Sequence, residues 1–160
     1  MQTVQWLFVV SVALFISGIG FVIASGRSGG AAAADEAPVA TPVASIAQVM
    51  NGITQPGALA IYGAVGTIVG AEGVKEIAPQ NDEEWAAVGN SAAAVIESGN
   101  LLLIGNRVVD TGDWVTMTRA MMDAGGMALK AVEAKSTDGI LEAGEKLNET
   151  CDTCHEKYQQ

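Results

Sequence analysis

Hydrophobic side chains recur every three or four residues from Pro42 to the C-terminus, which is the spacing of amphipathic α-helices. Four stretches of the chain show this spacing, and turn-like residues separate them. No stretch shows a sustained alternation of apolar and polar residues, and the β-branched residues are scattered. The pattern therefore predicts an all-α domain without strands.

The first predicted helix begins near Val43 and contains a proline at position 56. Proline has no backbone N–H, so we expect Pro56 to kink or interrupt this helix. The helical pattern resumes after the proline. The apolar positions of this stretch are Ile46, Met50, Ile53, Ile61, Val65 and Ile68.

The second predicted helix begins near Asp82, where Asn81 and Glu84 form a pattern resembling a capping box. The third follows the turn-like residues 110–112, and the fourth follows Ser136 and Thr137. The apolar stripes are Trp85, Val88, Ala92, Val95, Gly99 and Leu102; then Trp114, Met117, Met121, Ala124, Ala128 and Ala131; then Ile140, Gly144, Leu147, Cys151, Cys154 and Tyr158.

Stripes of this kind form the seam between antiparallel helices that cross at about 20°. We therefore expect residues 43–160 to form an antiparallel four-helix bundle. The many Ala and Gly residues on the inward faces allow the helices to approach closely. They also leave the core short of bulk, so that a large group can fill it.

The N-terminal segment contains 20 consecutive uncharged residues, Trp6–Ser25. This length matches the roughly 20 residues that an α-helix needs to cross a bilayer. Residues 1–25 are therefore predicted to be a transmembrane anchor, in preference to a cleaved signal segment, because no basic residue precedes the run. Residues 26–42 are rich in Gly, Ala, Ser and Pro and are predicted to be a flexible linker.

The chain is strongly acidic after this segment, and residues 35–160 carry a net charge of −11. Such a domain repels phosphate backbones, which argues against nucleic acid as a partner. It attracts a protein partner with a basic docking face. The acidic residues are equally well explained as solvated helix faces.

The two cysteines and the single histidine of the chain lie within five consecutive residues, Cys151-Asp152-Thr153-Cys154-His155. Cys-x-x-Cys-His is the attachment spacing of a c-type haem. On a helix the two thiols share one face and can reach the two vinyl groups of one porphyrin. His155 follows about 100° further round the helix and can bind the iron as the proximal ligand.

Other interpretations of the two cysteines fit less well. A zinc site needs three or four protein ligands, and the chain has no second Cys/His pair. A thioredoxin-like motif needs a βαβ context, which the pattern does not indicate. A disulfide alone leaves the adjacent histidine unexplained. We therefore predict one covalent haem c.

The ending Cys151–Tyr158, with CxxCH on the last helix of a four-helix pattern, resembles the cytochrome c′ / cytochrome c-556 family. The resemblance covers about residues 43–160, and only the CxxCH is specific. It implies a bundle fold, one haem, a bacterial periplasmic setting and a homodimer through the first two helices. One departure is Asp152, because many five-coordinate members carry a basic residue there.

The distal side of the haem iron decides the function that the resemblance implies. In low-spin members, a methionine of the first helix binds the iron there. Met50 lies at about the matching position and is the expected distal ligand, and the alternative is ordinary core packing. Residues expected to pack against the porphyrin are Trp114, Met117, Met121 and Tyr158.

A His/Met ligand pair suits electron transfer. We therefore expect a monohaem, membrane-tethered one-electron carrier on the periplasmic side of the bacterial inner membrane, and not an enzyme. If the signal segment is cleaved, the carrier is soluble in the periplasm. The alternatives are a five-coordinate haem protein that binds NO or CO, and a haem subunit of a membrane electron-transfer complex.

Overall fold

The computed structural model describes residues 40–159. The predicted anchor (1–25) and nearly all of the predicted linker (26–42) lie outside these residues. Residues 40–42 have no regular secondary structure. Within residues 40–159, no helix combines the length and the apolar character needed to cross a membrane.

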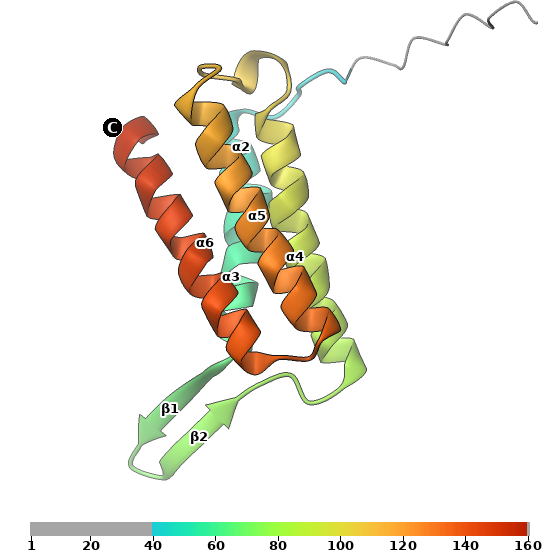
Figure 1. Ribbon diagram of the computed structural model, residues 1–160, viewed down its shortest axis with the longest axis vertical. Helices are drawn as coiled ribbons and strands as arrows, with labels where there is room; N and C mark the ends of the chain where they lie inside the picture. Colours follow the sequence, from blue (N-terminus) through green and yellow to red (C-terminus); the bar gives the residue numbers. More distant parts are fainter. Residues whose placement is uncertain (1–39, 160) are drawn as a thin grey trace, which may run out of the picture. The chain divides into compact units, whose positions relative to one another are not determined.

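The described chain is mostly helical and also contains a small two-stranded sheet (Figure 1). Its first helical stretch consists of α2 (Ile46–Val49), a π-helical turn η1 (Met50–Thr54) and α3 (Gln55–Ala64). Ser45 caps its start, because the Ser45 side chain accepts a hydrogen bond from the backbone N–H of Gln48 at 3.2 Å. The Gln48 side chain accepts a hydrogen bond from the Ser45 N–H in return, which completes a capping box.

The interruption expected at Pro56 takes the form of this π-helical turn. Pro56 lies in the first turn of α3, which directly follows the π-helical turn. The N–H of Gln55 bonds to the carbonyl of Met50, five residues earlier, instead of four. The extra residue in the turn therefore lets the helical stretch continue past the proline.

The prediction that this helix continues through Val65 to Ile68 is wrong. α3 ends at Ala64, and the chain then forms an antiparallel hairpin of β1 (Gly66–Gly70) and β2 (Gly73–Ile77). Three glycines disfavour a helix here, and the β-branched residues between them favour a strand. The alternation was not visible in the sequence because both faces of the hairpin are exposed, so neither face needs to be apolar.

The other three predicted helices are confirmed. They are α4 (Asp82–Leu102), α5 (Asp113–Glu133) and α6 (Thr137–Tyr158), and a short 3₁₀ turn, η2 (Gly105–Arg107), precedes α5. The predicted cap of α4 is also present, because the Asn81 side chain accepts a hydrogen bond from the N–H of Glu84 at 2.9 Å.

The predicted apolar stripes form the core where the helices pack. α5 packs against α4 and α6, and α3 packs against the same two helices (Figure 1). Every residue of the α4 stripe is buried. In the stripes of α5 and α6, four residues are only partly buried, and all four lie toward the end where α6 terminates: Met117, Cys151, Cys154 and Tyr158.

Glycines allow the close helix approach that the composition predicted. A Cβ atom on Gly57 of α3 would lie 2.9 Å from the Ser91 carbonyl oxygen and 2.9 Å from Val95 Cγ2, both on α4. A Cβ atom on Gly125 of α5 would lie 2.8 Å from Ile96 Cγ1. The backbones of α3, α4 and α5 therefore meet with no room for larger residues at these points.

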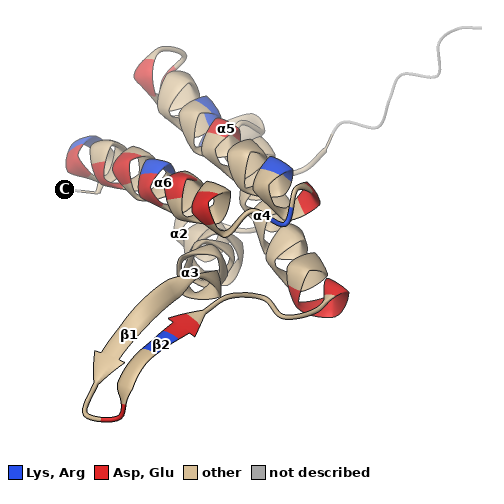
Figure 2. Cartoon of the chain, turned by 60° about the horizontal axis from the view of Figure 1, so that its bottom comes forward, with Lys and Arg blue, Asp and Glu red and all other residues tan. Residues whose placement is uncertain are grey.

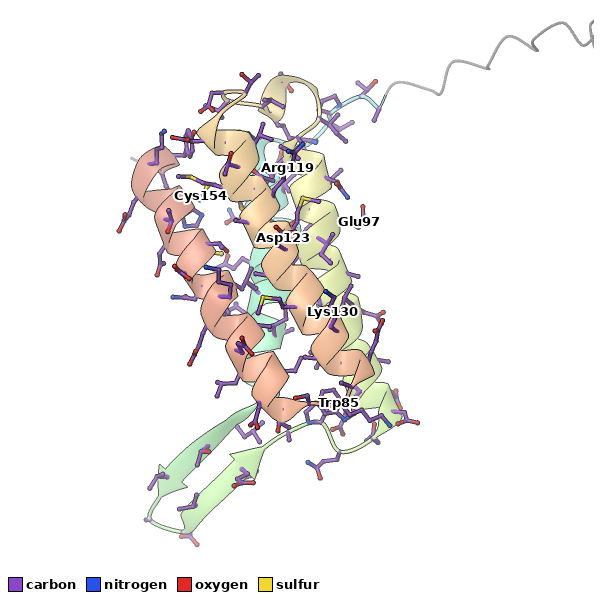
Figure 3. All side chains as sticks on the ribbon, in the orientation of Figure 1. Trp85, Glu97, Arg119, Asp123, Lys130 and Cys154 are labelled. Atoms are coloured by element: carbon purple, nitrogen blue, oxygen red, sulfur yellow. The ribbon has the colours of Figure 1, made fainter. Side chains whose placement is uncertain are left out.

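The charged residues of α4, α5 and α6 are mainly acidic (Figure 2), and all of them are exposed. Glu97, Arg119, Asp123 and Lys130, labelled in Figure 3, are exposed on α4 and α5. By contrast, residues 40–71, which include α2, α3 and β1, contain no Asp, Glu, Lys or Arg (Figure 2).

Candidate functional site

The Cys-x-x-Cys-His motif lies on the last two turns of α6. Ser136 caps the start of this helix, because its side chain accepts a hydrogen bond from the N–H of Gly139 at 3.0 Å. The helix then continues from Thr137 to Tyr158. Cys151 and Cys154 are therefore one helical turn apart, as predicted. Both thiols are half-buried, whereas His155 is exposed.

A cavity of about 590 Å³ opens beside the motif. Its volume lies within the range of small-molecule and cofactor sites, which is about 300–1,000 Å³. The structure brings every predicted site residue to its wall: Met50, Trp114, Met117, Met121, Cys151, Cys154, His155 and Tyr158. Residues from three separate helical stretches thus meet around one space.

The first helical stretch contributes two neighbouring residues in every four to this cavity, starting with Ile46 and Ala47. Its lining positions include Ile46, Met50, Thr54, Ala58 and Tyr62. In a regular α-helix, each four-residue step rotates the side chain by about 40°, so five such positions would drift off one face. The π-helical turn η1 offsets part of this drift, because it holds more residues per turn.

Sequence reasoning missed Thr54 and Tyr62. The spacing of four that continues from Ile46 and Met50 was the available signal, but the prediction followed the apolar residues Ile53 and Ile61 instead. Asn148, Thr118 and Thr150 were also missed as lining residues.

Two threonine hydroxyls in the cavity wall, those of Thr54 and Thr150, are bonded to the protein. Thr54 Oγ1 donates to Ser98 Oγ at 2.9 Å, and Ser98 Oγ donates to the Val95 carbonyl at 2.7 Å. Thr150 Oγ1 donates to the Leu147 carbonyl at 2.8 Å. Because these hydroxyls already have partners within the helices, the wall is less polar than its residue types suggest.

Two aromatic residues form the part of the wall near the C-terminus. The rings of Trp114 and Tyr158 meet edge to face, with centroids 5.1 Å apart. Trp114 Nε1 donates to the Leu102 carbonyl at 3.1 Å, and the Tyr158 hydroxyl donates to Asp110 Oδ2. The first bond connects the start of α5 to the end of α4, and the second connects the end of α6 to the loop before α5.

The two thiols are held in the neutral form. Burial raises the pKa of the Cys151 thiol, and the nearby Asp152 carboxylate adds to the rise. Burial also raises the pKa of the Cys154 thiol. Redox-active cysteine pairs of the thioredoxin type have a lowered pKa, so the site does not have the electrostatics of such a pair.

Tyr62 of α3 lies next to Cys151 of α6 in the cavity wall. Burial raises the pKa of its phenol to about 12, and the adjacent Cys151 and Asp152 add to the rise. Asp152 itself is exposed and accepts a hydrogen bond from Asn148 Nδ2 at 3.0 Å. The residue at which the chain departs from the resembled family therefore lies on the outer surface of α6.

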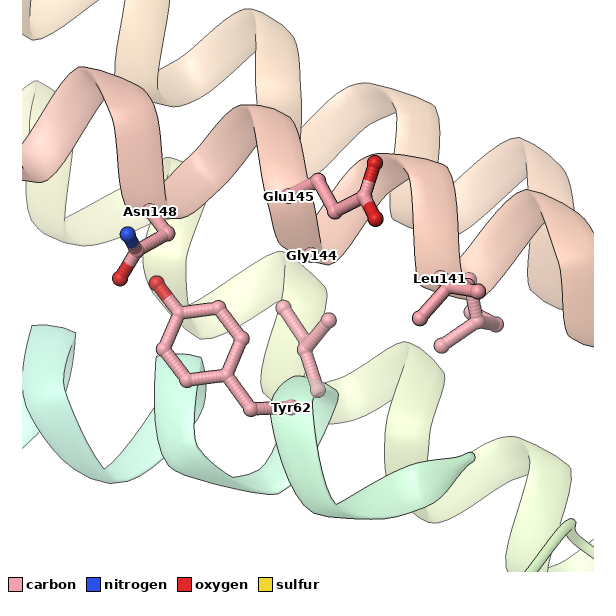
Figure 4. A pocket seen from close by; sticks show the side chains of 7 residues that line it. Tyr62, Leu141, Gly144, Glu145 and Asn148 are labelled. Carbon is pink, nitrogen blue, oxygen red and sulfur yellow. The ribbon is translucent and has the colours of Figure 1, made fainter. Parts of the chain in front are cut away.

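A second cavity of about 490 Å³ lies between α3 and α6 (Figure 4). It shares Tyr62 and Asn148 with the first cavity, and Figure 4 shows the Tyr62 hydroxyl directed toward Asn148. No other predicted or observed residue of the first site lines it. The chemistry-bearing residues therefore belong to the first cavity.

Within residues 40–159, no three His, Cys, Asp or Glu side chains converge as ligands for a metal ion. The residues around the first cavity instead fit a haem, since two thiols and an imidazole on one helix face a largely apolar space that holds a methionine on its far side. Comparison with protein-family models, with curated proteins and with solved structures gave no match for the chain.

Proposed function

We propose that the protein is a monohaem c-type cytochrome of the cytochrome c′ / cytochrome c-556 type that transfers single electrons. One observation carries the proposal: the residues of the CxxCH motif and the residues expected around a haem, which are far apart in sequence, line one cavity of about 590 Å³. In this proposal the four helical stretches form an antiparallel bundle, and the cavity at one end of the bundle holds the haem.

Each of the eight predicted site residues has a role in this proposal. Cys151 and Cys154 hold the haem through thioether bonds, and His155 binds the iron. Met50, from the first helical stretch, would supply a second ligand to the iron. Trp114, Met117, Met121 and Tyr158 pack against the porphyrin and exclude water. When bound, the haem supplies the one-electron exchange between ferric and ferrous iron.

The residues of the chain would set the reduction potential of the haem. A His/Met ligand pair raises the reduction potential, and a dry apolar wall raises it further by disfavouring the extra charge of ferric iron. Because the two ligands come from different helical stretches that pack together, the site moves little when the oxidation state changes. The acidic surface favours association with a basic redox partner, at a rate that falls with rising salt.

The proposal includes a location. The apolar run in residues 1–25 would anchor the domain on the periplasmic side of a bacterial inner membrane, and residues 26–42 would link the two. This segment lies outside the described residues, so the proposal rests here on the sequence alone.

Covalent haem attachment is the first test. The chain is expressed with a haem c maturation system, denatured and weighed by mass spectrometry. A mass increase of one haem is expected for the native chain. Cys151→Ala and Cys154→Ala should each remove one of the two bonds, and the double variant should lose the haem on denaturation. An unmodified native chain would refute the proposal.

The absorption spectrum, recorded oxidised and reduced with and without CO, tests the axial ligands. Sharp reduced α and β bands that CO does not change indicate the His/Met pair and an electron carrier. Met50→Ala should abolish the low-spin spectrum, whereas Met127→Ala, which alters a methionine outside the cavity, should keep it. A high-spin native spectrum that shifts at once with CO would favour gas binding instead.

A further inference from the structure

The β1–β2 hairpin has no role in the proposed electron transfer. It extends from the end of the helices opposite to the end at which α6 terminates, so it lies away from the haem cavity (Figure 1). All of its strand residues except Ile77 are exposed. An isolated two-stranded hairpin is marginally stable in water, which suggests that more strands add to it.

Its exposed residues are apolar. Ile68 is 54% exposed, Val69 77% and Val74 69%, and these are among the most exposed large hydrophobic residues within residues 40–159. Val69 and Val74 are directly opposite in the register, so they share one face, whereas Ile68 lies on the other. Both faces of the hairpin thus present apolar surface that another strand pair would extend and partly cover.

The two outer edges of the hairpin differ in charge. β2 contains Lys75 and Glu76, and charged residues on an edge strand oppose pairing with another chain. β1 has the sequence Gly-Thr-Ile-Val-Gly and contains no charged residue and no proline. The outer edge of β1 is therefore unprotected against pairing with another chain. β1 belongs to residues 40–71, which contain no charged residue (Figure 2).

The β1 sequence matches itself in the antiparallel direction. When Ile68 lies opposite Ile68 of a second copy, Thr67 lies opposite Val69, and the two glycines lie opposite each other. Every non-glycine pair is then β-branched, which is the favourable case for cross-strand packing. Counting from the Gly70–Gly73 pair that closes the turn, the backbone groups of Thr67 and Val69 point away from β2 and are free for this pairing.

We propose that β1 pairs antiparallel with β1 of a second copy of this chain, which forms a four-stranded sheet in the order β2-β1-β1-β2 about a two-fold axis. A second copy fits better than another protein because the strand is self-complementary and because two copies of a chain with a net charge of −10 repel each other least where their uncharged surfaces meet.

The pairing is independent of the proposed electron transfer and differs from a dimer through the first two helices. Strands of five residues bury less surface than a standard interface, so the dimer is weak and depends on concentration. It leaves the haem end of each copy open to redox partners.

Cysteine crosslinking of the full-length chain in detergent tests the proposal. Ile68→Cys places two thiols opposite each other at the two-fold axis, so mild oxidation should yield a disulfide-linked dimer as the main product. Lys75→Cys lies on the same hairpin but on the outer strand and should remain mainly monomeric. Cys151 and Cys154 are common to both variants and cancel in the comparison.

A second variant guards against accidental crosslinking. Ile68→Lys places two like charges opposite each other and should shift the sedimentation of the chain from dimer to monomer, while Val74→Lys on β2 should leave the dimer in place. Equal crosslinking of Ile68→Cys and Lys75→Cys would overturn the proposal. Efficient crosslinking only in Leu59→Cys, on the exposed face of α3, would also overturn it, because the dimer would then form through helices.

Discussion

The ring of Tyr158, in the last turn of α6, meets the ring of Trp114, in the first turn of α5, edge to face at 5.1 Å and an angle of 87°. The Tyr158 hydroxyl also donates to Asp110, which accepts a backbone bond from Gly112 at 2.8 Å. The end of α6 is thus attached to the first turn of α5 by a ring contact and to the loop before α5 by a hydrogen bond.

Tyr158→Phe separates these two contacts, because it keeps the ring and removes the hydroxyl. The hydrogen bond from Tyr158 is the main cause that lowers the pKa of Asp110 below its ordinary value of 3.8. A lowered folded-state pKa gives stability that is present above pH 3.8 and is lost as the pH falls through the folded value. We therefore expect Tyr158→Phe to be slightly less stable than the native chain at pH 7, and this difference should shrink as the pH falls below 3.8.

Urea unfolding at pH 7 and at pH 2 measures this difference, and haem attachment should remain intact in the variant. A difference between the two chains that is the same at pH 7 and pH 2 would show that the hydroxyl acts by another route.

Gly57→Ala tests the close packing of α3 on α4. The added methyl group would lie 2.9 Å from the Ser91 carbonyl oxygen, which belongs to the backbone and cannot move aside alone. We expect a loss of about 1–3 kcal/mol in the free energy of unfolding, the usual cost of overpacking. Gly63→Ala is the matched control in the same helix, since nothing lies within 4 Å of its added methyl group.

The control should gain about 0.5–1 kcal/mol, because alanine favours a helix more than glycine does. Denaturant unfolding of both variants gives the comparison. Two variants of equal stability would mean that α3 and α4 do not touch at Gly57.

Tyr62 should titrate with a pKa of about 12, above its ordinary value of 10.0. A raised folded-state pKa gives stability that is complete below pH 10 and is lost as the pH rises from 10 to 12. Because Cys151 contributes to the rise, Cys151→Ala should lower the pKa of Tyr62 in the chain without haem. Tyrosinate absorbance in a Tyr158→Phe background reports Tyr62 alone, and an ordinary pKa there would place Tyr62 away from Cys151.

Arg107→Met tests a buried guanidinium that joins two segments. Arg107 is 6% exposed, and it donates to the Ala44 carbonyl at 2.9 Å and to the Leu101 carbonyl at 2.7 Å. Methionine fills the space but removes the donor to the Ala44 carbonyl and leaves the Leu101 carbonyl with only the backbone N–H of Ile104 at 3.4 Å. We expect a loss of about 1–3 kcal/mol in the free energy of unfolding, the usual cost of an acceptor that stays buried without a partner. The measurement is chemical unfolding, combined with limited proteolysis near Ala44.

Arg119→Met is the control for Arg107→Met, because Arg119 is exposed on α5. Faster cleavage near Ala44 is expected only in the Arg107 variant. Equal behaviour of the two variants would mean that Arg107 does not hold the start of the first helical stretch.

The periodicity of the sequence located α4, α5 and α6 and nearly all of the inward positions, because each of these helices buries one continuous face. It failed between Val65 and Ile77, where the hairpin is exposed on both sides and no buried face imposes a pattern. The hydrophobic spacing placed Ile53 and Ile61 on the inward face, where Ile61 is buried and Ile53 is partly buried. It overlooked Thr54 and Tyr62, because polar residues that line a cavity do not follow the hydrophobic spacing.

By itself the sequence determined the Cys-x-x-Cys-His motif, because Cys151, Cys154 and His155 are neighbours in the chain and a helix alone fixes their relative positions. Only the tertiary structure decided that Met50, Tyr62 and Trp114 meet this motif at one cavity. Those residues lie on different helical stretches, and their meeting depends on how the helices pack and on the π-helical turn that keeps Met50 and Tyr62 on one face. The local spacing of residues carries no information about the packing of the helices or about the π-helical turn.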